Sequence, residues 1–448
     1  MASDPPGAPG RHTIIRGGGF FDLGGSAQSS RGHPINSHPD HNEPDRLPAA
    51  SDVHDANAAT APTAPAAATT PTASAAVTGW RRVRVRIRFL SKNLRHRARE
   101  YLGWLLARMI GTRHYATALR AEEVSSVLIC RINGRIGNTL FLTPLIRYLH
   151  ELLPNAAIDL ALAYPEAQEL LRGMPGVRRI IVFPHREPLK LGRYVAALRR
   201  LRAWRYDLAI DPTEFSTSGR VMLVLCRSRY RLGFATSAQW APLTHAVPLP
   251  RAAMHQAVRP LYLPHRIFGA PLQPQTVRLW LPLPEDELAA GRRIIVQAIA
   301  PEPLQTPSNV FGFFAHAANL KFIDRAWWVA FWDAFLGLEP RAVPVEFLPS
   351  PQLPPTNARF ASLHVRSTRG LTAAIAATRV FISTDTGPMH LASTTAVPTV
   401  GLFLASDPGL YGPLKPDDLA ITIMRYSPGE VAQRCQRIWV ASGSVAGA

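Results

Sequence analysis

The sequence is poor in cysteine, in acidic residues and in long apolar runs. It has 3 Cys in 448 residues, with no Cys-x-x-Cys pair and no histidine at zinc-site spacing, which excludes a disulfide scaffold and argues against a structural zinc site. No run of about 18 apolar residues occurs, so we expect no membrane-spanning helix. The chain also opens without the basic-then-apolar order of a secretory signal. These absences predict a protein of a reducing, cytoplasmic compartment.

The composition that remains favours a folded, basic protein. Hydrophobic residues make up 47% of the chain and charged residues 18%, a proportion that supports a large packed core. The length predicts two or three domains of about 100–200 residues each. Lys and Arg number 50 against 31 Asp and Glu, giving a formal net charge of +19. That charge is uneven, because residues 80–120 hold twelve basic residues and a single acid, Glu100.

The first 120 residues form two segments with different properties. Residues 1–79 include a stretch of Ala, Pro and Thr at 61–76 that cannot bury enough apolar surface to offset the entropy of ordering, so we expect a disordered tail. Residues 80–120 alternate basic with apolar residues and then carry leucines at helical spacing, which predicts a basic amphipathic segment. Its first part, 80–112, suits an anionic membrane surface. A solvated helix packed on the main domain is one alternative.

Nucleic-acid binding through the same segment is another alternative, since positive charge alone would permit it. It fits least well. The globular part of the chain shows no basic groove with interleaved aromatic residues.

The rest of the chain alternates apolar strand-like runs with helical patterns, and it does so twice. The expected strands are VLICR (127–131), AIDLAL (157–162), RRIIVF (178–183), YDLAID (206–211), VFGFFAHA (310–317), VPVEFL (343–348), VFIST (380–384) and TVGLFL (399–404). Buried strands that alternate with helices of 10–15 residues, roughly, are typical of parallel sheets covered by helices on both faces. The pattern therefore predicts two doubly wound α/β halves, at 121–285 and 286–448, that face a shared cleft.

The sharpest chemical signal is a strand that runs into a helix through Asp385, Thr386 and Gly387. Pro388 suits the first helical turn, so the free N–H groups of the helix start would face the cleft and form a seat for a diphosphate. Asp385 is a candidate to accept sugar hydroxyls. His390, one turn into the helix, would point to the phosphate or to the core. An ordinary Asp cap on a buried helix is the alternative.

Several motifs, in one order, resemble glycosyltransferase family 9, the ADP-heptose:lipopolysaccharide heptosyltransferases. The motifs are VLICRINGRIGNTLFLTPLIRYLHELLPNAAIDLAL (127–162), YDLAID (206–211), RLGF (231–234), Lys321, DTGPMHLAS with VPTVGLF (385–403) and SDPGLYGP (406–413). They span about two thirds of the chain and leave residues 1–120 outside. The resemblance implies a GT-B-like fold, with two Rossmann-like domains that bind the acceptor in the first and the donor nucleotide in the second.

The resemblance also implies a reaction, the inverting transfer of a heptose or related sugar from a nucleotide sugar, ADP-heptose, to a lipopolysaccharide core or another lipid-linked glycan. No metal and no cofactor are expected, because Lys321 and the helix start would stabilise the departing diphosphate. The implied donor-binding residues are Lys321, Asp385, Thr386, Gly387 and His390. Such an acceptor suits an enzyme that is peripheral on the inner face of the inner membrane.

The first loop departs from the pattern of this family. Many members carry Ile-Gly-Asp, whereas this chain has Ile136-Gly137-Asn138, and an Asn amide cannot take the acceptor proton. Asp211 or Glu214 after the fourth strand is then a candidate base, or the reaction relies on positioning by Asn138 and on leaving-group stabilisation. A sugar-nucleotide-binding protein with weak turnover is the alternative function. Asp211 could also simply cap the next helix.

Basic residues in the first half would receive an acidic acceptor. Arg131, Arg135 and Arg220 lie on or near expected carboxyl ends of strands, where the carboxylates and phosphates of inner-core sugars would dock. Ordinary surface charge explains each of them equally well. His255 resembles a position of the family, and a buried core histidine is the alternative.

Overall fold

The computed structural model describes residues 101, 118–184, 191–214, 216–235, 242–299, 309–317 and 319–445, and the structural statements below refer to these residues. The expected disordered tail lies outside them. The expected basic helix at 80–112 does too, apart from Tyr101. Among the helices of the described residues, none has the length and apolar character needed to cross a membrane.

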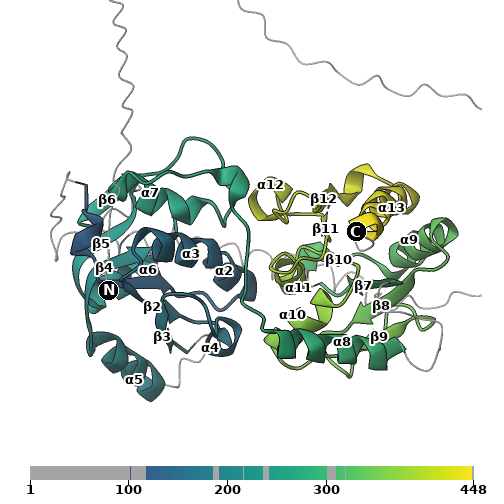
Figure 1. Cartoon of the computed structure of the whole chain (residues 1–448), viewed down its shortest axis with the longest axis horizontal. Coiled ribbons are helices and arrows are strands. Elements are labelled where there is room, and N and C mark those ends of the chain that lie inside the picture. Colours follow the sequence, from purple (N-terminus) through teal and green to yellow (C-terminus); the bar gives the residue numbers. More distant parts are fainter. Residues whose placement is uncertain are drawn as a thin grey trace, which may run out of the picture. The chain divides into compact units, whose positions relative to one another are not determined.

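Two parallel six-stranded sheets form the frame of the described chain (Figure 1). Their strand orders are β3-β2-β1-β4-β5-β6 and β12-β11-β10-β7-β8-β9. The strands of the first sheet are β1 (Ser126–Arg131), β2 (Ala157–Leu162), β3 (Val177–Val182), β4 (Arg205–Asp211), β5 (Arg227–Ala235) and β6 (His245–Pro248). The strands of the second are β7 (Val310–Phe314), β8 (Val343–Phe347), β9 (Ala361–Leu363), β10 (Val380–Thr384), β11 (Thr399–Phe403) and β12 (Leu419–Thr422).

Helices cover both faces of each sheet. In the first half they are α2 (Ile136–Leu140), α3 (Thr143–Leu152), α4 (Ala167–Leu170), α5 (Leu191–Arg202), α6 (Thr217–Leu225) and α7 (Tyr262–Phe268). In the second half they are α8 (Glu285–Ile299), α9 (Arg325–Leu338), α10 (Thr368–Ala376), α11 (Gly387–Ala392), α12 (Pro408–Tyr411) and α13 (Pro428–Val445). Adjacent strand residues point to opposite faces. Val127 of β1 therefore packs in the cluster of α3, α4 and α7, while Leu128 packs in that of α5 and α6.

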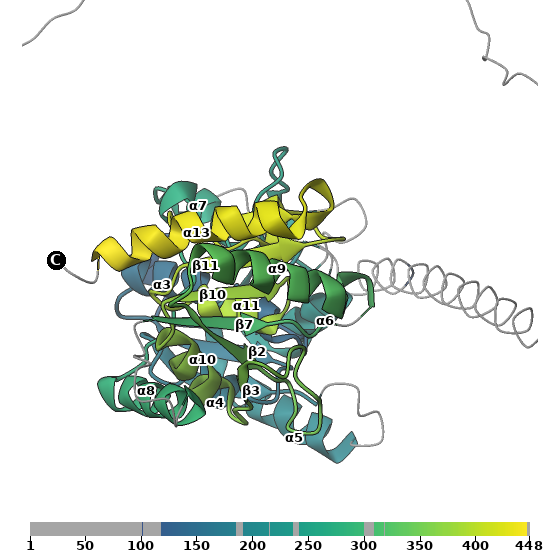
Figure 2. The same ribbon diagram turned by 90° about the vertical axis from the view of Figure 1, so that its right-hand side faces the viewer.

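The core of the second half is strongly aromatic on one face. Phe311 and Phe313 of β7 pack beneath α9 and α13, where Trp332 lies 4.8 Å from Phe313 between ring centroids. Helices α8, α10 and α11 cover the opposite face. The turned view shows α9 and α13 side by side across the sheet (Figure 2). Rings of this size contribute much of the buried apolar area that holds a sheet to its helices.

The predicted fold class is confirmed, and each of the eight expected strands is present. The strand expected at 310–317 is shorter in the structure, where β7 ends at Phe314 and a 3-10 turn at Asn319–Lys321 follows. Strand β5 was not predicted from the sequence, because its first half carries exposed arginines at alternate positions and does not resemble a buried strand. The short strands β6, β9 and β12 were not predicted either.

Helices α8 and α10 approach so closely that Gly291 of α8 has no room for a side chain. A Cβ atom there would lie 2.1 Å from the backbone oxygen of Ala373. We expect Gly291→Ala to lower the free energy of unfolding by about 1–3 kcal/mol, measured by urea denaturation of the full chain. Gly337→Ala in α9 is the matched control, because nothing lies within 4 Å of an added Cβ. This variant should be neutral or stabilising by about 0.5–1 kcal/mol; equal losses in both variants would contradict the packing.

Candidate active site at the carboxyl edges of the sheets

Each sheet reverses its strand order at one point, and predicted site residues lie at both points. In the first sheet the order reverses between β1 and β4, which end at Arg131 and Asp211. In the second it reverses between β7 and β10, which are followed by Lys321 and Asp385. Open parallel sheets bind ligands beyond the carboxyl ends of the strands at such points. The strand order alone therefore marks these two places as candidate binding sites.

In the second half, three side chains converge on the carboxylate of Asp385. The ammonium of Lys321 donates to Oδ2 of Asp385 at 2.5 Å and to its backbone oxygen at 2.9 Å. The hydroxyl of Ser406 donates to the same Oδ2, and Nε2 of His390 lies 3.6 Å from Oδ1. The side chain of Asp385 is 4% exposed and that of Lys321 is 39% exposed. The pair is thus fixed by the protein on one side and open to a ligand at Lys321.

Asp385 is an anion because of these contacts. Burial alone would raise the pKa of its carboxyl, but the hydrogen bonds from His390, Lys321 and Ser406 outweigh burial and hold the pKa well below its ordinary value. The carboxylate in turn fixes the ammonium of Lys321. An ammonium has three protons, and Asp385 accepts two of them, so one N–H of Lys321 remains for a bound anion.

Helix α11 begins directly after Asp385 and Thr386. The hydroxyl of Thr386 donates to the backbone oxygen of Thr384 and makes no hydrogen bond to the start of the helix. The first N–H groups of α11 are therefore left without a side-chain cap from Thr386. The predicted anion seat thus depends on these backbone groups, from Gly387 onward, together with Lys321.

Two glycines allow the halves to touch at this point. A Cβ atom on Gly137, in α2, would lie 2.6 Å from Cδ2 of His390. A Cβ on Gly387 would lie 2.6 Å from Cγ2 of Ile136, so both glycines are needed for the approach of α2 to α11. Phe141 packs edge-on against His390, with ring centroids 4.8 Å apart. The structure therefore brings together the two motifs that the sequence separates by about 250 residues.

Asn138, which is predicted to orient the acceptor where a catalytic Asp base was expected, has its side-chain oxygen engaged. Nη2 of Arg131, a buried residue at the end of β1, donates to Oδ1 of Asn138 at 3.0 Å. The group that Asn138 can offer to a ligand is therefore its NH2, a hydrogen-bond donor that cannot accept a proton. Burial lowers the pKa of Arg131 to about 10, although Asp211 and Tyr411 oppose it, so Arg131 remains charged at neutral pH.

Asp211 is fully buried at the end of β4 and is surrounded by protein partners. Its Oδ1 accepts from the backbone N–H of Thr213 at 3.1 Å and from the hydroxyl of the same residue. Its Oδ2 lies 3.1 Å from Nη1 of Arg220, which is also buried and donates to the backbone oxygen of Phe234. Burial raises the pKa of Asp211, while Arg220 and Thr213 act against it. These contacts favour positioning roles for Asp211 and Arg220 over direct contact with substrate.

Two predicted residues of the first half are more accessible. The side chain of Glu214 is 26% exposed and accepts a hydrogen bond from the guanidinium of Arg259. Arg135 is exposed in the loop after β1. Of the two carboxylates considered as a base, Glu214 is therefore the one that solvent and a ligand can reach.

His255 is a buried histidine that connects the first half to the loop after α12. Nε2 of His255 donates to the backbone oxygen of Gly412 at 2.9 Å, and Nδ1 accepts from the N–H of Ala257 at 3.1 Å. These two bonds select a neutral ring. Burial, with a smaller contribution from His390, lowers the pKa of His255 to about 4, although the bond to Gly412 opposes the change. The core-histidine alternative describes this residue well.

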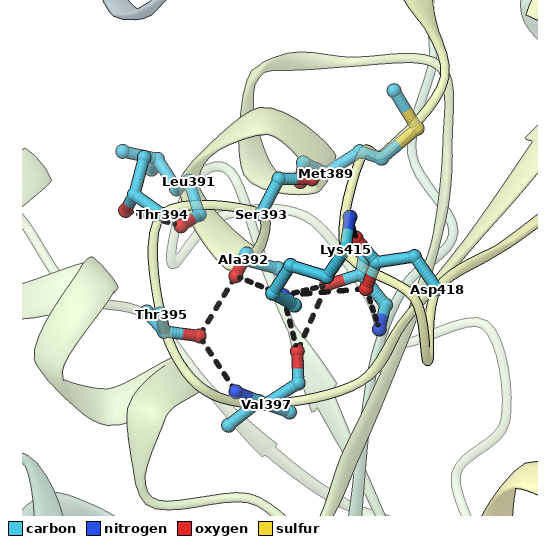
Figure 3. Close-up of polar contacts among 10 residues, drawn as sticks. Met389, Leu391, Ala392, Ser393, Thr394, Thr395, Val397, Lys415 and Asp418 are labelled. Atoms are coloured by element: carbon cyan, nitrogen blue, oxygen red, sulfur yellow. Dashed lines mark hydrogen bonds and ion pairs between the residues drawn. The ribbon is translucent and has the colours of Figure 1, made fainter. Parts of the chain in front are cut away.

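Lys415 contacts the carboxyl end of α11, and the sequence analysis did not predict a role for it. Its half-buried ammonium donates to the backbone oxygen of Val397 at 2.7 Å and lies 3.2 Å from Oδ1 of Asp418 (Figure 3). It also reaches the backbone oxygen of Ala392, the last residue of α11. Burial lowers the pKa of Lys415, and Asp418 opposes the change. Nothing in the local sequence marks this lysine, because a Lys between prolines and aspartates usually lies on the surface.

A groove of about 1330 Å³ lies beside Lys415 and apart from the Lys321–Asp385 pair. It is lined by residues 278–284, by Thr394 and Thr395 after the end of α11, and by Lys415. Lys321, Asp385 and His390 do not line it. In the described part of the chain, no three His, Cys, Asp or Glu side chains come together as a possible metal site.

A comparison with known protein families gives a match in the part of the chain that contains the Lys321–Asp385 pair's carboxylate and helix α11. Residues 367–437 match the family model of glycosyltransferase family 9 (heptosyltransferase). This stretch includes Asp385, Thr386, Gly387 and His390. No match was found among curated proteins.

Three solved structures share the fold over nearly their whole length. A family 9 glycosyl transferase from Veillonella parvula has a TM-score of 0.61 at 16% identity, covering 72% of this chain and 99% of its own. E. coli ADP-heptose lps heptosyltransferase II has a TM-score of 0.56 at 18% identity, with coverages of 71% and 99%. E. coli heptosyltransferase WaaC with ADP has a TM-score of 0.54 at 16% identity, with coverages of 70% and 99%. The resemblance to glycosyltransferase family 9 and the GT-B-like fold are thus confirmed.

The folded protein disfavours protonation of His255, so acid should destabilise it. Between the ordinary histidine pKa near 6.5 and about 4, the unfolded chain binds this proton and the folded chain does not, and stability falls as the pH falls. A Gln amide can donate to Gly412 and does not titrate. We expect His255→Gln to gain about 1–3 kcal/mol relative to wild type between about pH 7 and about pH 4.5, measured by urea denaturation. A difference that stays constant over this range would contradict the neutral, buried ring.

Proposed function

We propose that this chain is an inverting glycosyltransferase, because residues 367–437 match family 9 in sequence and both sheets share its fold. The proposed donor is a nucleotide sugar, ADP-heptose or a related sugar. The proposed acceptor is a lipopolysaccharide core sugar or another lipid-linked glycan. The observation that carries the proposal is the Lys321–Asp385 pair beside the start of α11.

The donor half would stabilise the leaving group. When the bond between the anomeric carbon and the diphosphate oxygen breaks, negative charge grows on the nucleoside diphosphate. Lys321 is held by Asp385 with one N–H to spare, next to the uncapped start of α11. A fixed cation and fixed dipoles stabilise such charge without reorganising during the reaction. The E. coli heptosyltransferase solved with ADP supports ADP as the product.

The acceptor half would hold the attacking hydroxyl and remove its proton. Asn138 presents an NH2 donor whose orientation is set by Arg131, and Arg135 adds an exposed positive charge for an acidic sugar. Glu214 is the accessible carboxylate of the two considered, and its partner Arg259 holds it in place. In this scheme Asn138 orients the acceptor and Glu214 receives the proton, while Asp211 and Arg220 support the loops from beneath.

Removing the charge of Lys321 should weaken nucleotide binding. We expect Lys321→Ala to bind ADP about 10–100-fold more weakly than wild type, since a charge-assisted hydrogen bond to phosphate is lost. Isothermal titration of the full chain with ADP measures this directly. Arg325→Ala is the matched control, because Arg325 is an exposed cation at the start of the neighbouring helix α9. If both variants bind like wild type, or if wild type binds no nucleotide, the donor site is wrongly placed.

A carboxylate at position 138 would test why this chain carries Asn. Arg131 lies 3.0 Å from Oδ1, so Asn138→Asp would place an ionised group against a fixed cation. We expect this variant to transfer sugar to a lipopolysaccharide core fragment about 10–100-fold faster, within the range of general-base effects. Asn138→Ala, which loses the bond to Arg131 and adds no base, should be slower than wild type.

An Asn138→Asp variant that gains no activity would be expected if Glu214 already acts as the base. The variant Glu214→Gln tests this explanation. Loss of transfer in Glu214→Gln with unchanged ADP binding assigns the base to Glu214. A wild type that binds ADP and transfers no sugar, while Asn138→Asp does, favours the alternative of a sugar-nucleotide-binding protein with weak turnover.

A further inference from the structure

An exposed helix with apolar side chains in solvent lies on the outside of the first sheet. Helix α5 packs near β3, the edge strand, and lies at the outer margin of the first half in both views (Figures 1 and 2). Its buried residues are Ala197 and Leu201. On its other sides, Leu191 is 70% exposed and Val195 is 37% exposed, one helical turn apart. Two exposed apolar side chains do not define a contact surface by themselves, so the charge beside them decides what this helix can bind.

The same segment is purely basic in its charge. The arginines of residues 191–205 are Arg193, Arg199, Arg200, Arg202 and Arg205, all exposed, and this segment has no acidic residue. The carboxylate beneath its end, Asp159, is fully buried and accepts hydrogen bonds from Arg178 and Arg179. Trp204 is 42% exposed, with the guanidinium of Arg179 3.5 Å above its ring. The surface therefore combines positive charge with apolar and aromatic groups.

The sheet topology sets the direction of this helix. Strand β3 ends at Val182, at the carboxyl edge, and β4 starts at Arg205, at the opposite edge. Helix α5 connects them, so its first residue, Leu191, lies toward the carboxyl edge and its last turn toward the other. The exposed apolar end of α5 is thus directed to the edge that carries Arg131 and Asn138.

We propose that α5 is a docking surface for an anionic lipid bilayer. Leu191 and Val195 enter the boundary between headgroups and acyl chains, and Arg199 and Arg200 bind the lipid phosphates. Nucleic acid would also attract the arginines, but a phosphate backbone offers no apolar counterpart for Leu191 and Val195. The purpose of this contact rests on the proposed function, because docking here would present a lipid-linked acceptor to the carboxyl edge. The surface is distinct from the expected membrane segment at 80–112.

Vesicle binding by the full chain tests the proposal. Wild type should bind vesicles of phosphatidylcholine with phosphatidylglycerol and should bind neutral phosphatidylcholine vesicles at least about tenfold more weakly. Arg199→Glu with Arg200→Glu should weaken binding to the anionic vesicles about 10–30-fold, and Leu191→Ser with Val195→Ser about 3–10-fold. The matched control is Arg425→Glu with Arg437→Glu, the same change of charge at exposed positions of the second half.

Two outcomes would overturn the proposal. Equal loss in the α5 pair and the control pair would mean that net charge alone drives binding. No loss in either α5 variant would assign the membrane contact to another segment, the basic stretch at 80–112 first of all. Hydrogen exchange on vesicles gives an independent readout, with protection expected at residues 191–202 and none at residues 425–437.

Two further measurements separate this proposal from its alternatives. Binding of duplex DNA that the α5 arginine pair abolishes, with no binding to vesicles, would replace the bilayer by nucleic acid. ADP titration of the same α5 variants should match wild type, because these residues lie outside the donor half. A wild type that binds anionic vesicles through α5 but binds no ADP would refute the proposed function and leave the docking surface standing.

Discussion

The candidate donor site depends on one buried carboxylate. Asp385 remains ionised because Lys321, Ser406 and His390 surround it, and it holds the ammonium of Lys321 at the start of α11. Loss of Lys321 would leave the buried carboxylate with Ser406 and His390 as its remaining partners, whereas Lys321, at 39% exposed, would be solvated if Asp385 were lost. The residues that would bind a diphosphate are therefore the same residues that hold this corner of the second half together.

Two kinds of contact join the halves. Glycines let helices approach closely, and hydrogen bonds connect residues of one half to the backbone of the other. Gly137 and Gly387 allow α2 to reach α11, and His255 connects the first half to Gly412. On the other side, the buried guanidinium of Arg369 donates to the backbone oxygen of Leu170 in the first half and pairs with Glu287 of α8. Groups of this kind fix relative position by geometry, since each bond has a preferred distance and direction.

The acceptor half uses buried charge in a different way. Arg131, Asp211 and Arg220 are all buried. Arg131 holds Asn138 in α2, and Asp211, paired with Arg220, holds Thr213, the residue before Glu214. Asn138 is neutral, so it adds no charge beside Arg131, whereas an Asp at this position would form an ion pair with Arg131. Position 138 thus carries a neutral hydrogen-bonding group beside a fixed cation.

Much of the fold was determined by the sequence itself. Apolar strands such as 127–131 and 380–384 are short, local and buried on both faces, so their pattern predicts a parallel sheet. The motif at 385–390 marked the candidate donor site for the same local reason. Tertiary structure alone decided that Asp211 is paired with Arg220, that Lys415 donates to the end of α11, and that Leu191 and Val195 are in solvent. Burial and ion pairing depend on what other segments place against a residue, and a linear pattern contains no record of those neighbours.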